Sequence, residues 1–151
     1  MLADVLTAVA VLSLGLAGLA SSLPVSGAAA AEGAQLSTAT FLAAARLEEV
    51  RAAPWTREPA VDRLGLSSDA DTAPEAGGAP SFPDEGRLPA PYGGFSRQVR
   101  IADCAGGAGC GGIVSPRLRQ ITIRVTFRPA AATGAAAAEK TIALTTLVAQ
   151  R

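Results

Sequence analysis

The chain has 151 residues, and its thirteen basic and thirteen acidic side chains leave it with no net charge. A neutral chain exerts no overall attraction on polyanions, so the composition argues against nucleic acid as a partner. The chain contains no histidine, the usual general base and commonest metal ligand, and no motif pairs a nucleophile with a base. We therefore predict a protein that is not an enzyme, with no cofactor, no small-molecule substrate and no metal site.

The first segment, residues 1–24, is predicted to be a transmembrane or filament stem. From Leu2 to Leu23 only Asp4 is charged, and a helix of about 22 residues spans a hydrocarbon core of ~30 Å. Two other interpretations remain open: a plain single-pass anchor, or a secretory signal peptide cleaved within the small residues of "SGAAAAEGA". The signal peptide is disfavoured, because an acid stands where such a peptide has its basic region.

Residues 25–53 are predicted to form an amphipathic helix, which continues the stem after a kink or interruption at Pro24. Apolar side chains recur at spacings of three and four, and Pro54 is expected to stop the helix. The apolar stripe consists of Leu36, Ala39, Ala43, Leu47 and Val50. A helix with one apolar stripe needs a surface to pack on.

Residues 54–94 are predicted to be a flexible acidic loop. The segment carries seven prolines together with many Gly, Ser and Asp residues, and such a composition has little apolar surface to bury. Asp69 and Asp71 in "SDADTAPE" resemble part of a calcium-binding loop, but the central glycine and the distal glutamate are missing. A solvated acidic loop is the favoured interpretation.

Residues 95–151 are predicted to form a small antiparallel sheet of about three strands. In "FSRQVRIAD" and "TIALTTLVA" apolar side chains alternate with polar ones, although Arg97 breaks the pattern in the first stretch. The clearest alternation is in "RQITIRVTFRP", whose predicted buried side chains are Ile121, Ile123, Val125 and Phe127. We expect Leu47 and Val50 to pack on this strand, because each apolar surface needs the other. The predicted fold class is therefore α+β, with a long N-terminal helix packed on the sheet.

Six arginines lie in or near the predicted strands, among them Arg117 and Arg119. Our candidates for contact with a partner are Arg97, Arg100, Arg124 and Arg128. Arginine alternating with threonine is also typical of the solvated face of a half-buried sheet, and this interpretation is favoured. If the arginines do bind, we expect an acidic surface of another subunit rather than DNA.

Cys104 and Cys110 enclose five small residues in "CAGGAGC". A disulfide that pins the turn after the first strand is the favoured interpretation, since an exported domain permits one. Free thiols are the main alternative. A metal pair is disfavoured, because a chain without histidine lacks ligands for a closed zinc site.

The ordered set of segments resembles the type IV pilin-like minor prepilins of the pilus-modification (PilV-type) family. "DVLTAVAVLSLGLAGLA" resembles their membrane stem, and "TATFLAAARLEEVRAAPW" resembles the helix that follows it. "YGGFSRQVRIAD", "LRQITIRVTF" and "TIALTTLVAQ" resemble their strands, in the same order. The resemblance covers most of the chain except residues 54–90. Pseudopilins of type II secretion share this architecture.

The resemblance implies a minor pilin-like subunit involved in the assembly or the tip of a type IV pilus or pseudopilus. Its partners would be other pilin-like subunits, bound through the stem, and the inner membrane before assembly. The head would be periplasmic, or extracellular in a pilus. In this family an acid near the start of the stem pairs with the α-amino group of a neighbouring subunit, and Asp4 occupies the matching position.

The family's stem follows a short basic leader that ends in a processed glycine, and neither precedes Met1. We expect the true start of the protein to lie upstream. The alternative function is an anchored or signal-peptide-bearing periplasmic binding module that uses the arginine-rich face of the sheet.

Overall fold

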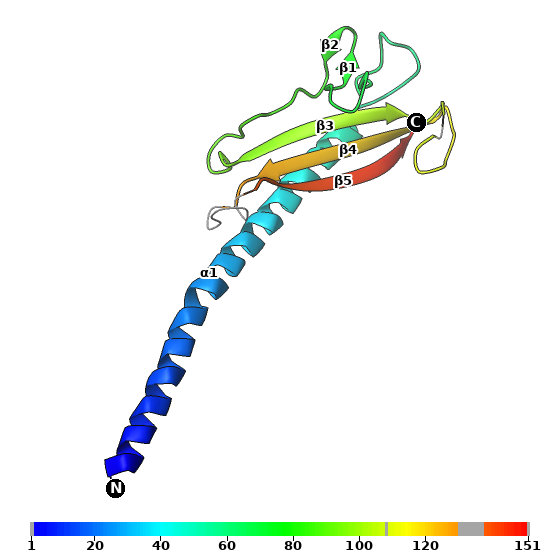
Figure 1. The fold of residues 1–151 in the computed structure, drawn as a ribbon. Helices are drawn as coiled ribbons and strands as arrows, with labels where there is room; N and C mark the ends of the chain where they lie inside the picture. The colour runs from blue at the N-terminus through cyan, green and yellow to red at the C-terminus, as the bar shows by residue number, and fades with distance from the viewer. Residues whose placement is uncertain (1, 108, 130–137, 151) are drawn as a thin grey trace.

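The computed structural model describes residues 2–107, 109–129 and 138–150, and within these the side chains of residues 19–26 are left out of the description. It contains one long helix, α1 (Leu2–Ala52), a short hairpin of β1 (Glu75–Ala76) and β2 (Ala79–Pro80), and a sheet. The strands of the sheet are β3 (Phe95–Asp103), β4 (Leu118–Phe127) and β5 (Lys140–Ala149). The predicted α+β fold class is confirmed (Figure 1).

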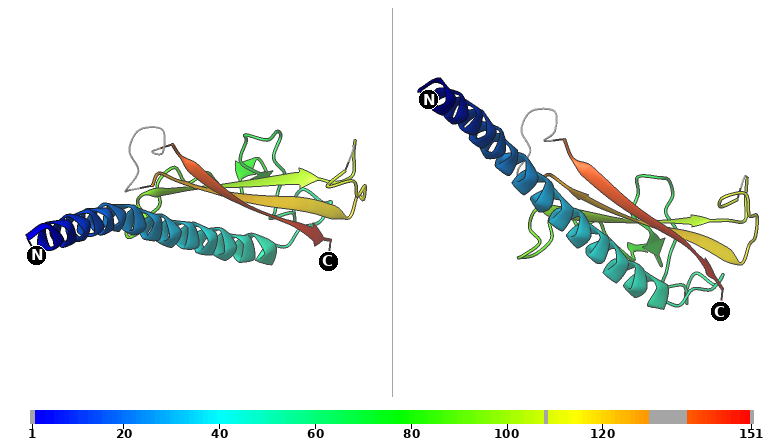
Figure 2. Two further views of the ribbon diagram at one scale, coloured as in Figure 1. Left: turned by 60° about the horizontal axis from the view of Figure 1, so that its bottom comes forward. Right: turned by 90° about the horizontal axis from the view of Figure 1, so that it is seen from below.

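Helix α1 is continuous from the stem into the head. The expected interruption at Pro24 does not occur, because α1 runs through this position, and the helix bends along its length (Figure 2). It ends at Ala52, and the amide of Ala53 still donates to the carbonyl of Val50 at 3.1 Å. Pro54 follows directly, as expected for a residue whose ring disfavours helix in the residue before it.

The sheet is antiparallel, with β4 in the centre between β3 and β5. The second half of α1 covers one face of the sheet, while the first half extends away from the head (Figures 1 and 2). Side chains on β4 alternate between buried and half-buried along the whole strand. This alternation is the one that the sequence pattern predicted, and it directs the apolar residues toward α1.

The core lies between α1 and the sheet. The helix contributes small and medium side chains, among them Ala39, Ala43 and Val50, each fully buried. The strands contribute Val99, Ile101, Ile121, Ile123, Val125 and Phe127. Leu47 is partly buried against the same cluster. The predicted packing of Leu47 and Val50 with the apolar face of β4 is therefore confirmed.

The segment between α1 and β3 differs from our prediction. We expected a loop with little apolar surface to bury, yet Leu64, Phe82 and Leu88 belong to the core cluster. These apolar side chains are widely separated in the sequence, so the average composition of the segment does not indicate that they are buried. Gly65 adopts a positive φ of 73°, and a Cβ atom there would lie 2.4 Å from the carbonyl oxygen of Glu75, so only glycine fits.

The same segment covers the outer edge of β3. Ser67 donates its amide to the carbonyl of Ile101 at 2.8 Å, and its hydroxyl accepts from the amide of Ile101 at 3.1 Å. Glu85 and Arg97 exchange two backbone hydrogen bonds of 2.9 and 2.8 Å. β3 is therefore paired on both sides, whereas β5 forms the other edge of the sheet.

Candidate functional site

The first half of α1 is an apolar surface that the described part of the head does not cover. Its large apolar side chains are between 56% and 81% exposed. They are Leu2, Val5, Leu6, Val9, Val11, Leu12, Leu14 and Leu16. These positions lie on all sides of the helix rather than along one stripe. A helix that is apolar all round is typical of a segment surrounded by lipid or by other helices.

Within the part of the chain whose side chains are described, which leaves out residues 19–26, no helix is both long and apolar enough to cross a membrane. Our predicted stem, residues 1–24, extends into the omitted residues. The membrane-spanning stem remains a prediction from the sequence.

Asp4 lies in the first turn of α1, where the helix dipole favours an acid. Its backbone carbonyl accepts a hydrogen bond from the hydroxyl of Thr7 at 2.9 Å. The residue is exposed and lies at the far end of the stem from the head (Figure 1). It therefore has no place in the folding core, and its predicted role concerns neighbouring subunits.

Cys104 and Cys110 form a disulfide that closes the turn after β3. Both residues are buried, and their Cα atoms are 5.1 Å apart. Backbone hydrogen bonds from Cys104 to the carbonyl of Leu118 and between Cys110 and Ile113 hold the turn in place. The structure thus agrees with the favoured interpretation over free thiols.

We predicted that Arg100 would contact a partner, but its side chain is bound within the head. Its side chain is only 8% exposed, and its guanidinium contacts Asp84 through two N–O pairs of 2.6 and 2.8 Å. It also donates to the backbone carbonyls of Ala70 and Asp71. The prediction fails because the preceding segment folds back over the outer face of β3 and uses the guanidinium for its own support.

The side chain of Arg97 also binds groups within its own chain. Its Nε atom lies 2.6 Å from a carboxylate oxygen of Glu85, and its Nη1 atom donates to the carbonyl of Leu42 on α1 at 3.4 Å. This explains the break in the strand pattern, because Arg97 occupies an inward-facing position and links β3 to the helix. The predicted partner-binding role of Arg97 is therefore corrected.

Arg119 is a third strand arginine that pairs with an acid of the segment between α1 and β3, although it was not among our candidates for contact with a partner. Its Nη1 atom lies 2.7 Å from Asp62, and its guanidinium stacks over the ring of Trp55 at 4.5 Å from the centroid. No sequence spacing connects these three residues. The sequence did contain one signal for this role. Arg119, like Arg97, stands at an inward-facing strand position where apolar residues are expected, which indicates a buried partner for its charge.

Arg124 and Arg128 are the two candidates that stay accessible. Arg124 is half-buried on the outer face of β4 and lines a shallow cavity of about 410 Å³ with Arg100 and Asp69. Arg128 is 69% exposed and contacts Glu139 at 3.4 Å. Two accessible arginines make a much smaller basic surface than the four we predicted.

The ion pairs change the acidity of their members. The hydrogen bond from Arg97 holds the pKa of Glu85 below its ordinary 4.5. The hydrogen bond to Asp84 raises the pKa of Arg100 further above its already high range. Both ion pairs therefore attach the segment before β3 to that strand.

Asp69 supports its own loop. Its Oδ1 atom accepts hydrogen bonds from the amides of Asp71 and Thr72, each at 2.8 Å, and from the hydroxyl of Thr72 at 2.7 Å. These bonds, led by the one from the Thr72 hydroxyl, lower the pKa of Asp69. Among the described residues, no three side chains of the metal-binding types lie close enough to hold an ion.

Comparison with known proteins gives no match: no family model, no curated protein and no solved structure is similar to this chain. The resemblance to minor prepilins therefore rests on the sequence segments alone.

Proposed function

We propose that this chain is a minor pilin-like structural subunit that acts in the assembly or at the tip of a type IV pilus or a pseudopilus. It performs no catalysis in this role. Its stem is held in the inner membrane before assembly and in a bundle of stems afterwards, and its head is exposed to the periplasm or the exterior.

One observation carries the proposal: an apolar helix extends from a folded head and is exposed on all sides (Figure 1). Such a surface is unfavourable in water, at roughly 25 cal/mol per Å² of apolar area. Lipid and a bundle of similar helices both remove it from water. A subunit that moves from one to the other needs no change in its head.

Asp4 is the residue that distinguishes the two environments. A carboxylate is energetically unfavourable in lipid, whereas in a bundle of stems an ammonium partner stabilises it. We propose that the partner is the α-amino group of a neighbouring subunit, as the resemblance implies. This pairing sets the register between stems.

The alternative, a periplasmic binding module, depended on an arginine-rich face. Arg97 and Arg100 are bound within the head, so this alternative keeps only Arg124 and Arg128. We therefore favour the assembly subunit.

The test is fractionation of the full chain, followed by measurement of its intact mass. We expect an intact stem and a protein that fractionates with membranes. Val11→Asp should release it into the soluble fraction, because an acid near the centre of a membrane helix costs about 2.5–3.5 kcal/mol. Val61→Asp is the matched control, since Val61 is an exposed residue of the head. Cleavage within residues 25–35, or a soluble uncleaved chain, would refute the proposal.

A further inference from the structure

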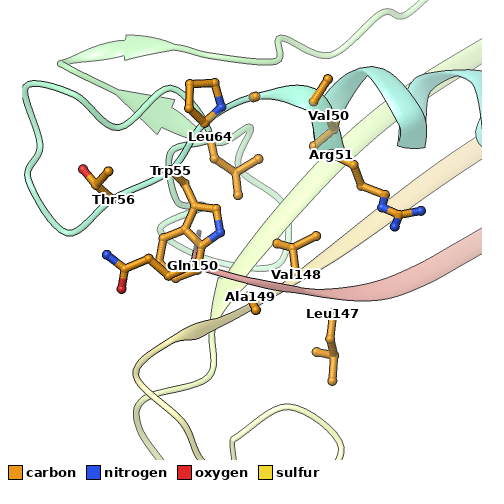
Figure 3. Close-up of a pocket in the computed structure, with 12 residues that line it drawn as sticks. Val50, Arg51, Trp55, Thr56, Leu64, Leu147, Val148, Ala149 and Gln150 are labelled. Atoms are coloured by element: carbon orange, nitrogen blue, oxygen red, sulfur yellow. The ribbon is translucent and has the colours of Figure 1, made fainter.

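A cavity of about 370 Å³ lies where the end of α1 meets the end of β5 (Figure 3). Residues 50–56 form one wall, residues 147–150 form the other, and Leu64 closes the space between them. Most of the lining residues are aliphatic, and polar atoms contribute nearly half of the lining surface. Its polar side chains are Arg51, Thr56, Gln150 and the indole of Trp55. The cavity is therefore suited to an apolar group that also carries a polar atom.

Trp55 supplies an unsatisfied hydrogen-bond donor. The side chain is 7% exposed, and its buried Nε1 atom has no hydrogen-bond partner among the described residues. Figure 3 shows this nitrogen on the side of the ring that faces Val148 across the cavity. Arg119 stacks on the ring and fixes its orientation. Buried donors are normally satisfied, so this unsatisfied N–H group beside the cavity indicates an acceptor on a ligand.

The cavity adjoins an unpaired strand edge. Gln150 donates its amide to Arg117 at 2.9 Å, and the antiparallel alternation then directs the amides of Ala149, Leu147 and Thr145 away from β4. In the described part of the chain, no backbone group pairs with this outer side of β5. Charges and prolines usually protect such edges, but β5 carries only Lys140, at its opposite end.

We propose that the edge of β5 and this cavity together bind an extended peptide segment of a partner protein. The segment adds to β5 as a fourth strand, places an aliphatic side chain in the cavity and presents an oxygen to the N–H group of Trp55. Backbone hydrogen bonds then provide affinity, and the cavity provides specificity. The indole nitrogen is covered in the free protein, so the oxygen enters with a small shift of the side chains around it.

A second copy of the chain fits this site less well. Antiparallel pairing of two β5 strands centred on Thr145 would place Lys140 of the second copy opposite Gln150, beside the cavity. A lysine ammonium only donates hydrogen bonds, so its side chain cannot serve the indole N–H group. Lys140 is also paired with Glu32 of its own chain. The proposed site involves the head alone and does not depend on the function proposed for the stem.

The test uses the full chain in detergent micelles and a blocked, fluorescein-labelled hexapeptide of alternating threonine and leucine. We expect saturable binding by fluorescence anisotropy below about 1 mM. The emission of Trp55, the only tryptophan of the chain, should change over the same range. Trp55→Phe keeps the aromatic ring and removes the donor, so it should weaken binding about tenfold.

Two further variants separate the edge from the cavity. Thr145→Pro removes an outward amide and should abolish binding, whereas Thr145→Ala keeps that amide and should bind normally. A hexapeptide with alternate N-methylated amides tests the same bonds without altering the protein, and it should not bind. Absence of saturable binding, or binding that neither Trp55→Phe nor N-methylation affects, would overturn the proposal. So would a concentration-dependent dimer that Thr145→Pro abolishes, because the edge would then belong to a second copy.

Discussion

Arg119 of β4 forms a buried ion pair with Asp62, with 2.7 Å between Nη1 and Oδ2 and side chains only 7% and 10% exposed. The other oxygen of Asp62 accepts hydrogen bonds from the amides of Leu64 and Gly65 at 3.1 and 3.3 Å. One carboxylate therefore fixes the course of the segment after α1 and attaches it to the central strand.

Asp62→Ala should be strongly destabilising. It leaves the Arg119 guanidinium buried without its partner, and removal of one member of a buried pair typically costs about 3–5 kcal/mol. Glu139→Ala is the matched control, because Glu139 and Arg128 form an exposed pair, and such pairs contribute about 0–1 kcal/mol. Chemical denaturation of both variants measures the difference. Similar losses in the two would contradict the structural role of Asp62.

Adjacent helix positions provide a second test of the packing. Leu42 is 6% exposed and belongs to the core, whereas Phe41 beside it is 61% exposed. Leu42→Ala should cost about 2–5 kcal/mol because it opens a cavity between α1 and the sheet. Phe41→Ala should change the free energy of unfolding by no more than about 0.5 kcal/mol. Thermal unfolding compares them, and a larger effect at Phe41 would place the core on the wrong face of α1.

The ion pair between Glu85 and Arg97 predicts a pH dependence. Because the pKa of folded Glu85 lies below its ordinary 4.5, the pair stabilises the fold fully above that value. The stabilisation is lost as the pH falls through the lower folded pKa. The difference in melting temperature between wild type and Glu85→Gln should therefore shrink between about pH 6 and pH 3. Glu58→Gln, at an exposed position, is the control for the substitution itself.

The disulfide between Cys104 and Cys110 should stabilise the head modestly. The residues are six positions apart, and a loop of this size corresponds to about 2 kcal/mol in the chain-entropy account. A Cys104→Ala, Cys110→Ala double variant should melt lower than the wild type. Dithiothreitol should lower the melting temperature of the wild type to that of the double variant, and it should not change the melting temperature of the double variant. An effect of the reductant on the double variant would show that it acts elsewhere.

Asp4→Ala should affect assembly and leave the head intact. Asp4 lies at the far end of the stem, so its removal breaks no core contact (Figure 1). In a bundle of stems it would leave a neighbour's ammonium unpaired, at about 3–5 kcal/mol, or a factor of hundreds or more in subunit addition. Incorporation into sheared filaments, measured with the correctly processed protein, tests this. Asp4→Glu should incorporate at least as well as wild type, and normal incorporation of Asp4→Ala would remove the pairing role.

The sequence by itself determined the long helix and the three strands of the main sheet, but not the β1–β2 hairpin. The helical stem follows from the length of its apolar run. The amphipathic half of α1 and the strand with Ile121, Ile123, Val125 and Phe127 follow from local periodicity, because a helix and a strand each repeat their buried face at a fixed interval. The same periodicity predicted that α1 would pack on β4. The turn around Cys104 was also foreseen, since two cysteines enclosing small residues can meet with little rearrangement.

Only the tertiary structure decided where the arginines go and what the loop buries. Arg97, Arg100 and Arg119 find Glu85, Asp84 and Asp62 across separations of 12, 16 and 57 positions. No period links such partners, and a charge on a strand looks the same in sequence whether water or a folded loop covers it. The cavity beside Trp55 exists for the same reason. It forms where the end of α1, Leu64 and the end of β5 converge, and the sequence contains no local signal for a meeting of three distant segments.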